Sequence, residues 1–301
     1  MKRLIVTADD FGAAAEVNEA VEAAHRAGVL SAASLMVGAP CAADAIARAR
    51  RLPGLRVGLH LTLLQGRPVL PAAAVPQLLS RRGMFLSSPA ALGARLSASP
   101  GARRQLAEEI RAQFAAFSAS GLKLDHCNAH LHFHLHPLVG RLIESIGRGF
   151  GLRAVRLPLE PVEVLRRVER PAWSAAAALT VPFALALRRR LAAANLLIAE
   201  RTFGLRWSGQ MSRARLAGIV RHLPEGVSEI YLHPATGAYP GAAPGYRYRE
   251  ELEALTAPEV IAACREPAVR LGGFGDFLPS EPAAPAIAGR GAHAARPGMS
   301  A

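Results

Sequence analysis

Short apolar segments alternate with segments of helical periodicity along nearly the whole chain. The segments that resemble buried strands cover residues 3–8, 33–37, 55–61, 122–125, 154–157, 228–232 and 269–271. Those with helical periodicity cover residues 14–27, 42–51, 102–118, 138–148 and 250–263. Strands that alternate with helices in this way indicate an α/β fold with a mainly parallel sheet, either open or closed as a barrel.

The composition is that of a globular protein with ample material for a core. Of 301 residues, 51% are hydrophobic and 20% are charged, which excludes a disordered chain or a disulfide scaffold. The three cysteines are far apart and form no CxxC pair, so reduced thiols are expected, as in the cytoplasm. No phosphate-binding glycine motif is present. Residues 279–301, rich in proline, alanine and glycine, are predicted to be a disordered tail.

The formal net charge of +13 is spread along the chain, which favours a compositional origin over a dedicated binding surface. Nucleic acid is not an expected partner, because aromatic residues make up only 5% of the sequence. An anionic lipid or a membrane surface is the main alternative. We expect a cytoplasmic protein, with peripheral contact at the inner membrane surface as an open option.

One apolar segment, residues 173–187, stands out because three arginines follow it at 188–190. It is too short to span a bilayer and contains a proline. We predict a helical insert over about residues 171–200. It could form a lid over an apolar ligand, contact a membrane surface, or pack as ordinary core.

Polar side chains follow four of the predicted strands. Asp9 and Asp10 end the first strand, His60 ends the third, His130 follows the fourth, and His233 ends the strand at 228–232. Because the carboxyl ends of parallel strands meet at one face, we expect these residues to share a site. The two adjacent carboxylates are expected to point to opposite sides of the strand.

A run of alternating histidines strengthens this hypothesis. His130, His132, His134 and His136 recur at every second position, so an extended backbone would place four imidazoles on one side. Such a polar face has no role in core packing, although a lone histidine such as His60 is more often structural. One or two of the four are predicted to bind a metal, and the others to support the ligands or contact a substrate.

One carboxylate and two imidazoles, with positions left for water, suit a catalytic divalent metal. The set would accept zinc, cobalt, nickel, magnesium or manganese. A bound metal would activate water, a spare carboxylate would take its proton, and a second titratable group would protonate a departing amine. Asp9 and His233 could fill these two roles. The residue types therefore predict metal-assisted hydrolysis of an amide or an ester.

Four motifs, TADDFG, GLHLTL, NAHLHFHLHP and YLHPAT, resemble those of the YdjC-like (ChbG-like) carbohydrate deacetylases, in order and spacing, from residue 1 to about 278. The segments LMVGAP, RLPGLRVGLHL and RAVRLP are most similar to the hopanoid-biosynthesis-associated HpnK branch. The resemblance implies a deformed (β/α) TIM-like barrel, a single domain over residues 1–278 with the helical insert. It also implies removal of an acetyl group from an N-acetylated amino sugar.

The resemblance also implies roles for individual residues. One divalent metal ion, with magnesium or zinc expected, would be held by Asp10, His60 and His130. Asp9 would be the general base and His233 the general acid. The residues expected to support the ligands or to contact the substrate are Asn128, His132, His134 and Arg156.

For the HpnK-like branch the implied substrate is an N-acetylglucosaminyl hopanoid lipid. Many family members carry Asp-Ser where this chain has Asn128-Ala129. A supporting negative charge would then come from elsewhere, and Asp125 is the candidate.

Two other functions remain open at this point. One is a different barrel-type metal hydrolase, either a phosphoesterase or an amidohydrolase, although amidohydrolases usually carry HxH rather than Asp-Asp after the first strand. The other is a non-catalytic protein that binds metal and lipid. The oligomeric state is not predicted.

Overall fold

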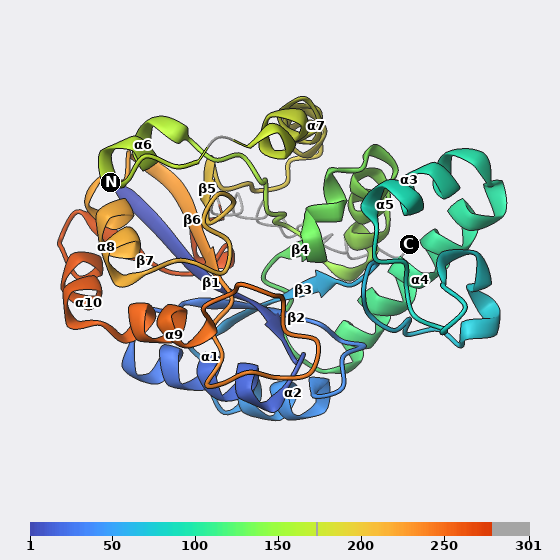
Figure 1. Ribbon diagram of the computed structural model, residues 1–301, viewed down its shortest axis with the longest axis horizontal. Coiled ribbons are helices and arrows are strands. Elements are labelled where there is room, and N and C mark those ends of the chain that lie inside the picture. Colours follow the sequence, from blue (N-terminus) through green and yellow to red (C-terminus); the bar gives the residue numbers. More distant parts are fainter. Residues whose placement is uncertain (173, 279–301) are drawn as a thin grey trace, which may run out of the picture.

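A computed structural model describes residues 1–172 and 174–278 (Figure 1). Its centre is a curled, all-parallel sheet in the order β4-β3-β2-β1-β6-β5, with β7 paired to β1. The strands are β1 (Lys2–Phe11), β2 (Ala32–Leu35), β3 (Arg56–Leu61), β4 (Cys127–Ala129), β5 (Arg201–Phe203), β6 (Gly226–Leu232) and β7 (Val269–Leu271).

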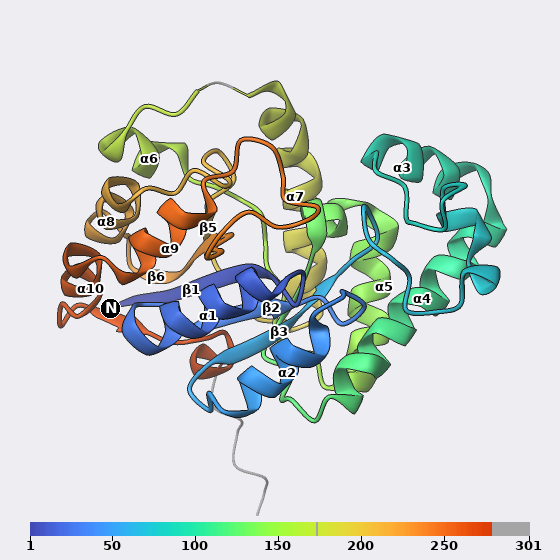
Figure 2. The ribbon, with the colours of Figure 1, turned by 60° about the horizontal axis from the view of Figure 1, so that its bottom comes forward.

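Helices surround the sheet (Figures 1 and 2). They are α1 (Ala15–Ala27), α2 (Ala42–Arg50), α3 (Pro89–Ala98), α4 (Pro100–Ala119), α5 (Pro137–Gly147), α6 (Val162–Val168), α7 (Ala175–Ala193), α8 (Arg213–Arg221), α9 (Tyr248–Thr256) and α10 (Pro258–Cys264). Short 3₁₀ helices are η1 (Ala72–Ala74), η2 (Pro76–Leu78), η3 (His130–Leu135), η4 (Arg148–Phe150) and η5 (Gly275–Phe277).

The sheet closes into a barrel through an irregular segment, residues 153–159, that lies between β4 and β5. On one side the Cys127 N–H donates to the carbonyl of Ala154 at 3.0 Å. On the other side the Thr202 N–H donates to the carbonyl of Leu159, also at 3.0 Å. A closed ring with one irregular seam is a deformed (β/α) barrel, so the predicted fold class is confirmed.

Strand β1 is buried on both faces, which explains its apolar sequence. Leu4, Val6 and Ala8 belong to the large core beneath the helices, whereas Ile5 packs in a second core with Phe274 and Phe277. Residues that alternate with Leu4 and Val6 therefore face the barrel interior, and Thr7 and Asp9 continue the Ile5 side. The same alternation directs Asp9 into the barrel interior, and its position in β1 places it near the carboxyl ends of the strands.

Three local predictions were wrong. The strand predicted at residues 154–157 is reduced to isolated bridges at Ala154 and Val155, within the irregular segment. Residues 250–263 form α9 and α10 rather than one helix, because Pro258 lacks the N–H that a continuous helix needs and instead starts α10. Residues 122–125 are not a strand, since pairing with β3 begins at Cys127. Helices α3, α6 and α8 and strand β5 were not predicted.

Helix α7 lies within the predicted insert of residues 171–200. No helix among residues 1–172 and 174–278 is long and apolar enough to cross a membrane. The domain limits, 1–278 for the barrel and 171–200 for the insert, stay predictions. Trp173 and the predicted tail at 279–301 lie outside the described residues.

Candidate active site

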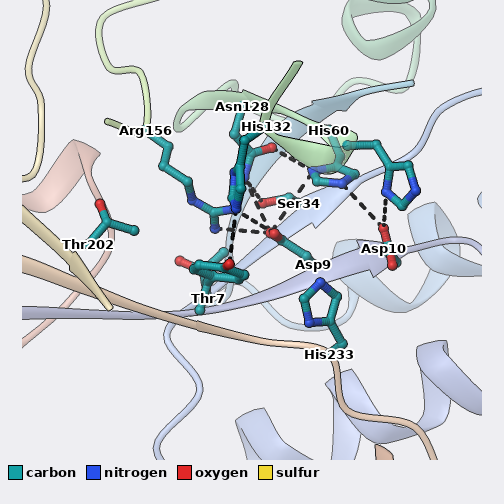
Figure 3. Close-up of polar contacts among 12 residues, drawn as sticks. Thr7, Asp9, Asp10, Ser34, His60, Asn128, His132, Arg156, Thr202 and His233 are labelled. Atoms are coloured by element: carbon teal, nitrogen blue, oxygen red, sulfur yellow. Dashed lines mark hydrogen bonds and ion pairs between the residues drawn. The ribbon is translucent and has the colours of Figure 1, made fainter. Parts of the chain in front are cut away.

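The end of β1 turns both aspartates toward one site (Figure 3). The pairing register breaks between Ala8 and Phe11, and Asp10 adopts a left-handed backbone with φ 62°. Aspartate tolerates this conformation better than most residues. The expectation that the adjacent carboxylates point to opposite sides was therefore wrong: Asp9 Oδ1 lies 4.0 Å from Nδ1 of His60, and Asp10 Oδ1 lies 3.2 Å from Nε2 of the same ring.

Asp10, His60 and His130 form a compact set of metal-ligating side chains. Asp10 Oδ1 lies 3.2 Å from His60 Nε2 and 3.1 Å from His130 Nδ1, and the three ligand atoms are within 4.8 Å of one another. Burial raises the pKa of Asp10, but His130 and His60 outweigh it and hold the pKa well below its usual value. The structure thus brings together the three residues that were predicted to hold the metal.

The hydrogen bonds of His60 fit a metal ligand. Its Nδ1 lies 2.7 Å from Oδ1 of Asn128, an amide oxygen that can only accept, so the ring proton is assigned to Nδ1. Nε2, beside Asp10, is then the ring nitrogen that could bind a metal. His130 reaches the set from the first residue of η3, with its Nε2 3.4 Å from Gln65 Oε1.

A buried chain of hydrogen bonds fixes the side-chain amide of Asn128. Its Nδ2 donates to Ser34 Oγ at 2.9 Å and to Asp9 Oδ1 at 3.3 Å. Ser34 Oγ is 3.1 Å from Nε2 of His126, whose Nδ1 is 2.9 Å from Asp125 Oδ2. Asp125, the candidate for a supporting negative charge, therefore reaches the site only through His126 and Ser34.

Replacing Asn128 with alanine is expected to weaken metal binding by about 10- to 100-fold, because His60 loses the acceptor that fixes its tautomer and orientation. Competition with a chromophoric chelator would measure the affinity. Ser145→Ala, on an exposed hydroxyl of α5, is a control that should leave it unchanged. An unaltered affinity in Asn128→Ala would contradict the role assigned to the amide.

Arg156 is fully buried between two carboxylates. Its Nη1 and Nη2 donate to Asp9 at 2.5 and 3.0 Å, and its Nε and Nη2 donate to Glu229 at 3.0 and 2.8 Å. Thr7 Oγ1 donates to Glu229 as well, at 2.9 Å. Burial raises the pKa of Asp9, but opposing effects, of which the charge of Arg156 is the largest, leave the pKa far below its usual value. Asp9 is therefore held ionised and in one orientation.

His233 lies directly after β6 and points toward Asp9 and Asp10 (Figure 3). Its ring contacts the rings of Tyr231 and Tyr246, with centroids 5.6 and 5.0 Å away. Its Nδ1 is buried and has no hydrogen-bond partner among the described residues. Burial lowers the pKa of His233, although the two aspartates oppose this effect. The ring of His233 is therefore positioned beside the two aspartates.

Glu251 on α9 holds the backbone of His233 in place. Its carboxylate accepts hydrogen bonds from the backbone N–H of His233 at 2.5 Å and from that of Met211 at 2.8 Å. Burial raises the pKa of Glu251 from its usual 4.5 to about 7, against the effect of these two hydrogen bonds. Because the folded-state pKa is the higher one, the folded protein holds this proton more tightly than the unfolded chain. The resulting stabilisation is complete below pH 4.5 and is lost as the pH rises through about 7.

We therefore expect the free energy of unfolding of the wild type, relative to that of Glu251→Gln, to fall by about 3 kcal/mol as the pH rises through this range. Urea unfolding of both proteins at a series of pH values would measure the difference. The glutamine that replaces Glu251 does not titrate, and all other titratable groups are the same in both proteins. Their contributions therefore cancel in the difference between the two free energies of unfolding. A difference that does not change with pH would show that Glu251 does not have this raised pKa.

The histidine run is not extended, and this prediction was wrong. Leu131 and His132 have φ of 54° and 53°, and residues 130–135 form η3. His132 Nε2 lies 3.0 Å from the Tyr231 hydroxyl, whereas His134 is fully buried with Nε2 3.1 Å from the carbonyl of Arg156. His136 precedes α5 and is half-buried. His130 is the member of the run that joins the metal set, and His134 supports the backbone of Arg156.

Sequence reasoning missed Glu229, Ser34, Tyr231 and Glu251. Only Glu229 carried a signal that could have found it. It is a charged residue in the middle of SEIYL, a strand whose other residues are buried. A carboxylate in such a strand needs a buried cationic partner, and Arg156 is that partner.

Two cavities lie near the site, and one of them is lined by residues of the metal set. This one, of 260 Å³, is lined by Asp10 and His130 and also by Gln65 and Tyr239. The other is an apolar groove of 810 Å³ between η3, α3 and α7, which His132 lines and which none of the three metal-set residues reaches. The residues of this groove used below are Leu131, Phe133, Leu159, Val181 and Phe183.

A parallel α/β barrel with a carboxylate and two histidines at the carboxyl ends of its strands is typical of metal-dependent hydrolases. The sequence model of one family, described as YdjC-like protein, matches residues 3–266. The chain therefore belongs to the YdjC-like family, as the motifs predicted. Membership of the hopanoid-associated branch stays a prediction.

Curated relatives carry matching names. A carbohydrate deacetylase of Geobacillus stearothermophilus is 30% identical over 278 residues, which cover 91% of this chain and 97% of that protein. A carbohydrate deacetylase of Brevibacillus brevis is 41% identical over 156 residues, covering 52% and 59% of the two chains. A chitooligosaccharide deacetylase of Serratia marcescens is 35% identical over 167 residues, covering 55% and 62%. The prediction of an enzyme of the carbohydrate deacetylase class is confirmed by these relatives.

The fold has a solved counterpart. A crystal structure from Enterococcus faecalis, whose title names a cellobiose-phosphate cleavage protein, superposes with a TM-score of 0.71. The two chains are 22% identical, and the match covers 92% of this chain and 99% of that one. At this level of identity the likeness supports the fold alone.

Proposed function

We propose that this protein is a metal-dependent carbohydrate N-deacetylase that acts on an N-acetylated amino sugar linked to a polycyclic terpenoid lipid, an N-acetylglucosaminyl hopanoid. The observation that carries the deacetylase assignment is the set of Asp10, His60 and His130 with Asp9 and His233 beside it. The full-length relatedness to a carbohydrate deacetylase supports the same chemistry.

A divalent cation held by Asp10, His60 and His130 would activate water and polarise the acetamide carbonyl when bound. Asp9 is the general base in this proposal, because it is ionised and its carboxylate is fixed by Arg156 and Asn128. It would accept the proton of the attacking water while the water oxygen bonds to the acetamide carbon. The fixed carboxylate needs no reorientation for this step.

His233 is the general acid. Its ring points toward Asp9 and Asp10, whose negative charges favour the protonated form of the ring. The protonated ring would donate its proton to the nitrogen as the carbon–nitrogen bond breaks, releasing acetate and the free amine. Tyr231 and Tyr246 hold the ring in place through their contacts with it.

The lipid part of the proposal rests on the apolar groove that His132 helps to line. Leu131, Phe133 and Leu159 line it from the barrel side, and Val181 and Phe183 line it from α7. At 810 Å³ the groove is of the size that ligand pockets commonly have, and its wall suits a rigid hydrocarbon. The smaller cavity beside Asp10 and His130 would take the sugar.

The test is a substrate panel with the metal-loaded protein, in which acetate release is measured. The panel holds an N-acetylglucosaminyl hopanoid, short acetylated chitooligosaccharides, a phosphoester and a cyclic amide. We expect acetate from the acetylated sugars, with kcat/KM at least tenfold higher for the lipid-linked one. Phe183→Gln should raise KM for the lipid-linked substrate and leave that for the short sugars unchanged.

Each other result identifies a different function. Acetate release with no preference for the lipid would contradict the hopanoid assignment and leave a carbohydrate deacetylase. Turnover of the phosphoester or the cyclic amide alone would indicate another barrel hydrolase. Several metals per chain without any turnover would indicate a metal-binding protein. Comparing the glycosylated hopanoids of cells with and without the gene by mass spectrometry would test the substrate in vivo.

A further inference from the structure

The amino-terminal half of α7 presents an unusual apolar surface. The structure describes seven exposed large hydrophobic side chains, and four of them, Leu179, Val181, Phe183 and Leu185, lie on this helix. Leu179 is 72% exposed, the highest value of the seven. Isolated exposed apolar residues are common, but a cluster of them marks an interaction site.

The helix is anchored at its other end. Ala184, Leu187 and Leu191 are buried, and α7 contacts α5 and η3. Arg190 adds an ion pair to Glu144 of α5 at 2.7 Å. Figure 1 shows α7 at the edge of the molecule, across the sheet from α1 and α2. The exposed apolar side chains of α7 therefore lie at the edge of the molecule, on a helix that its buried residues and this ion pair hold in place.

Charge follows the apolar half directly. Residues 174–187 contain no ionisable side chain, and Arg188 and Arg189 come next, both exposed. Within residues 1–172 and 174–278 neither arginine has a carboxylate partner. Arg166 and Arg167, exposed on α6, likewise have none there. Unpaired cations beside an exposed apolar surface are complementary to anionic lipid headgroups.

The dimensions fit a membrane surface. Thirteen uncharged residues, 175–187, form a helical segment of about 20 Å, which is short of the roughly 30 Å hydrocarbon core. A segment of this length can lie along the interface between headgroups and acyl chains, but it does not reach across the bilayer.

We propose that the amino-terminal half of α7 docks on an anionic lipid bilayer, with its apolar side chains in the interface and Arg188 and Arg189 at the lipid phosphates. Because Val181 and Phe183 also line the groove, docking would bring the groove to the bilayer surface. A lipid-linked substrate could then reach the site without crossing water. That last consequence rests on the proposed function, whereas docking does not.

The test is flotation of the full-length protein with phosphatidylcholine vesicles, with and without phosphatidylglycerol. Leu179→Gln/Leu185→Gln removes apolar surface outside the groove and keeps good helix formers, and it should lower the partition coefficient at least tenfold. Arg188→Gln/Arg189→Gln should lower it about tenfold on the anionic vesicles. Arg81→Gln/Arg82→Gln makes the same charge change at two exposed arginines elsewhere and should alter it less than about twofold.

Two results would overturn docking by α7. One is no wild-type binding to the anionic vesicles. The other is an equal loss from the Arg81/Arg82 pair and the Arg188/Arg189 pair, which would show that net charge alone binds the vesicles. Acetate release from a water-soluble acetylated sugar should be unchanged in the Leu179/Leu185 variant. If neither the wild type nor any variant releases acetate, but vesicle binding follows the expected pattern, the proposed function is wrong and the docking proposal is still supported.

Discussion

Removing one metal ligand, by Asp10→Asn or His130→Ala, is expected to reduce acetate release from an acetylated amino sugar by about a thousandfold or more. Each change removes one of only three ligand atoms, which lie within 4.8 Å of one another. Asp10 also carries the only negative charge of the set, so its amide would weaken electrostatic attraction for any divalent ion. Treatment of the wild type with a chelator should give the same loss.

Two measurements belong together in this test: acetate release, and the metal content of each purified variant by mass spectrometry. His222→Gln is the matched control, because His222 caps α8 by contact with the Gly218 carbonyl, in a helix that contributes no ligand. It should retain both metal and activity. Full acetate release by either ligand variant, or by the chelated wild type, would refute metal-dependent deacetylation.

The second large effect concerns stability. Arg156→Met is expected to lower the free energy of unfolding by about 3–5 kcal/mol, because it leaves the buried carboxylates of Asp9 and Glu229 without their common cation. The methionine would fill much of the volume, so the loss would come from charge rather than from a cavity. Urea unfolding monitored by circular dichroism would measure it.

A rescue variant separates charge from packing. Arg156→Met combined with Asp9→Asn and Glu229→Gln removes all three charges and should recover part of the lost stability. Arg26→Met is the control, because Arg26 pairs with Glu22 at the surface of α1 and its loss should cost less than about 1 kcal/mol. A loss at Arg156 no larger than at Arg26 would show that the buried pairs contribute little.

The metal set was predictable because of where its residues fall. Asp10 and His60 lie at the carboxyl ends of β1 and β3, and His130 directly follows β4. Parallel strands bring their carboxyl ends together whatever the detailed register. Topology alone was therefore enough to place the three side chains near one another. His233, after β6, follows from the same rule.

The supporting residues depend on register, which the sequence pattern does not reveal. Glu229 meets Arg156 only because β6 pairs with β1 at a particular offset, and Ser34 meets Asn128 through two further strand pairings. Gly58 illustrates the same limit. A Cβ atom there would lie 2.5 Å from the ring of His126, so the glycine makes room for the ring behind the site.

The histidine run shows a different limit. Its period of two is the period of a strand, yet left-handed backbones at Leu131 and His132 coil it into η3. The elements on either side of the run account for this conformation. Strand β4 ends at Ala129, and α5 starts at Pro137, eight residues later. In that short space an extended run would carry the chain away from α5.

The three metal ligands also set an order for the assembly of the site in the cell. About 50 residues separate Asp10 from His60, and about 70 separate His60 from His130. A chain emerging from the ribosome therefore exposes two ligands well before the third, and no complete set exists until β4 has paired with β3. The chain therefore binds a cation tightly only after the sheet has folded. During synthesis its incomplete ligand set has low affinity for any divalent ion, including the most abundant one.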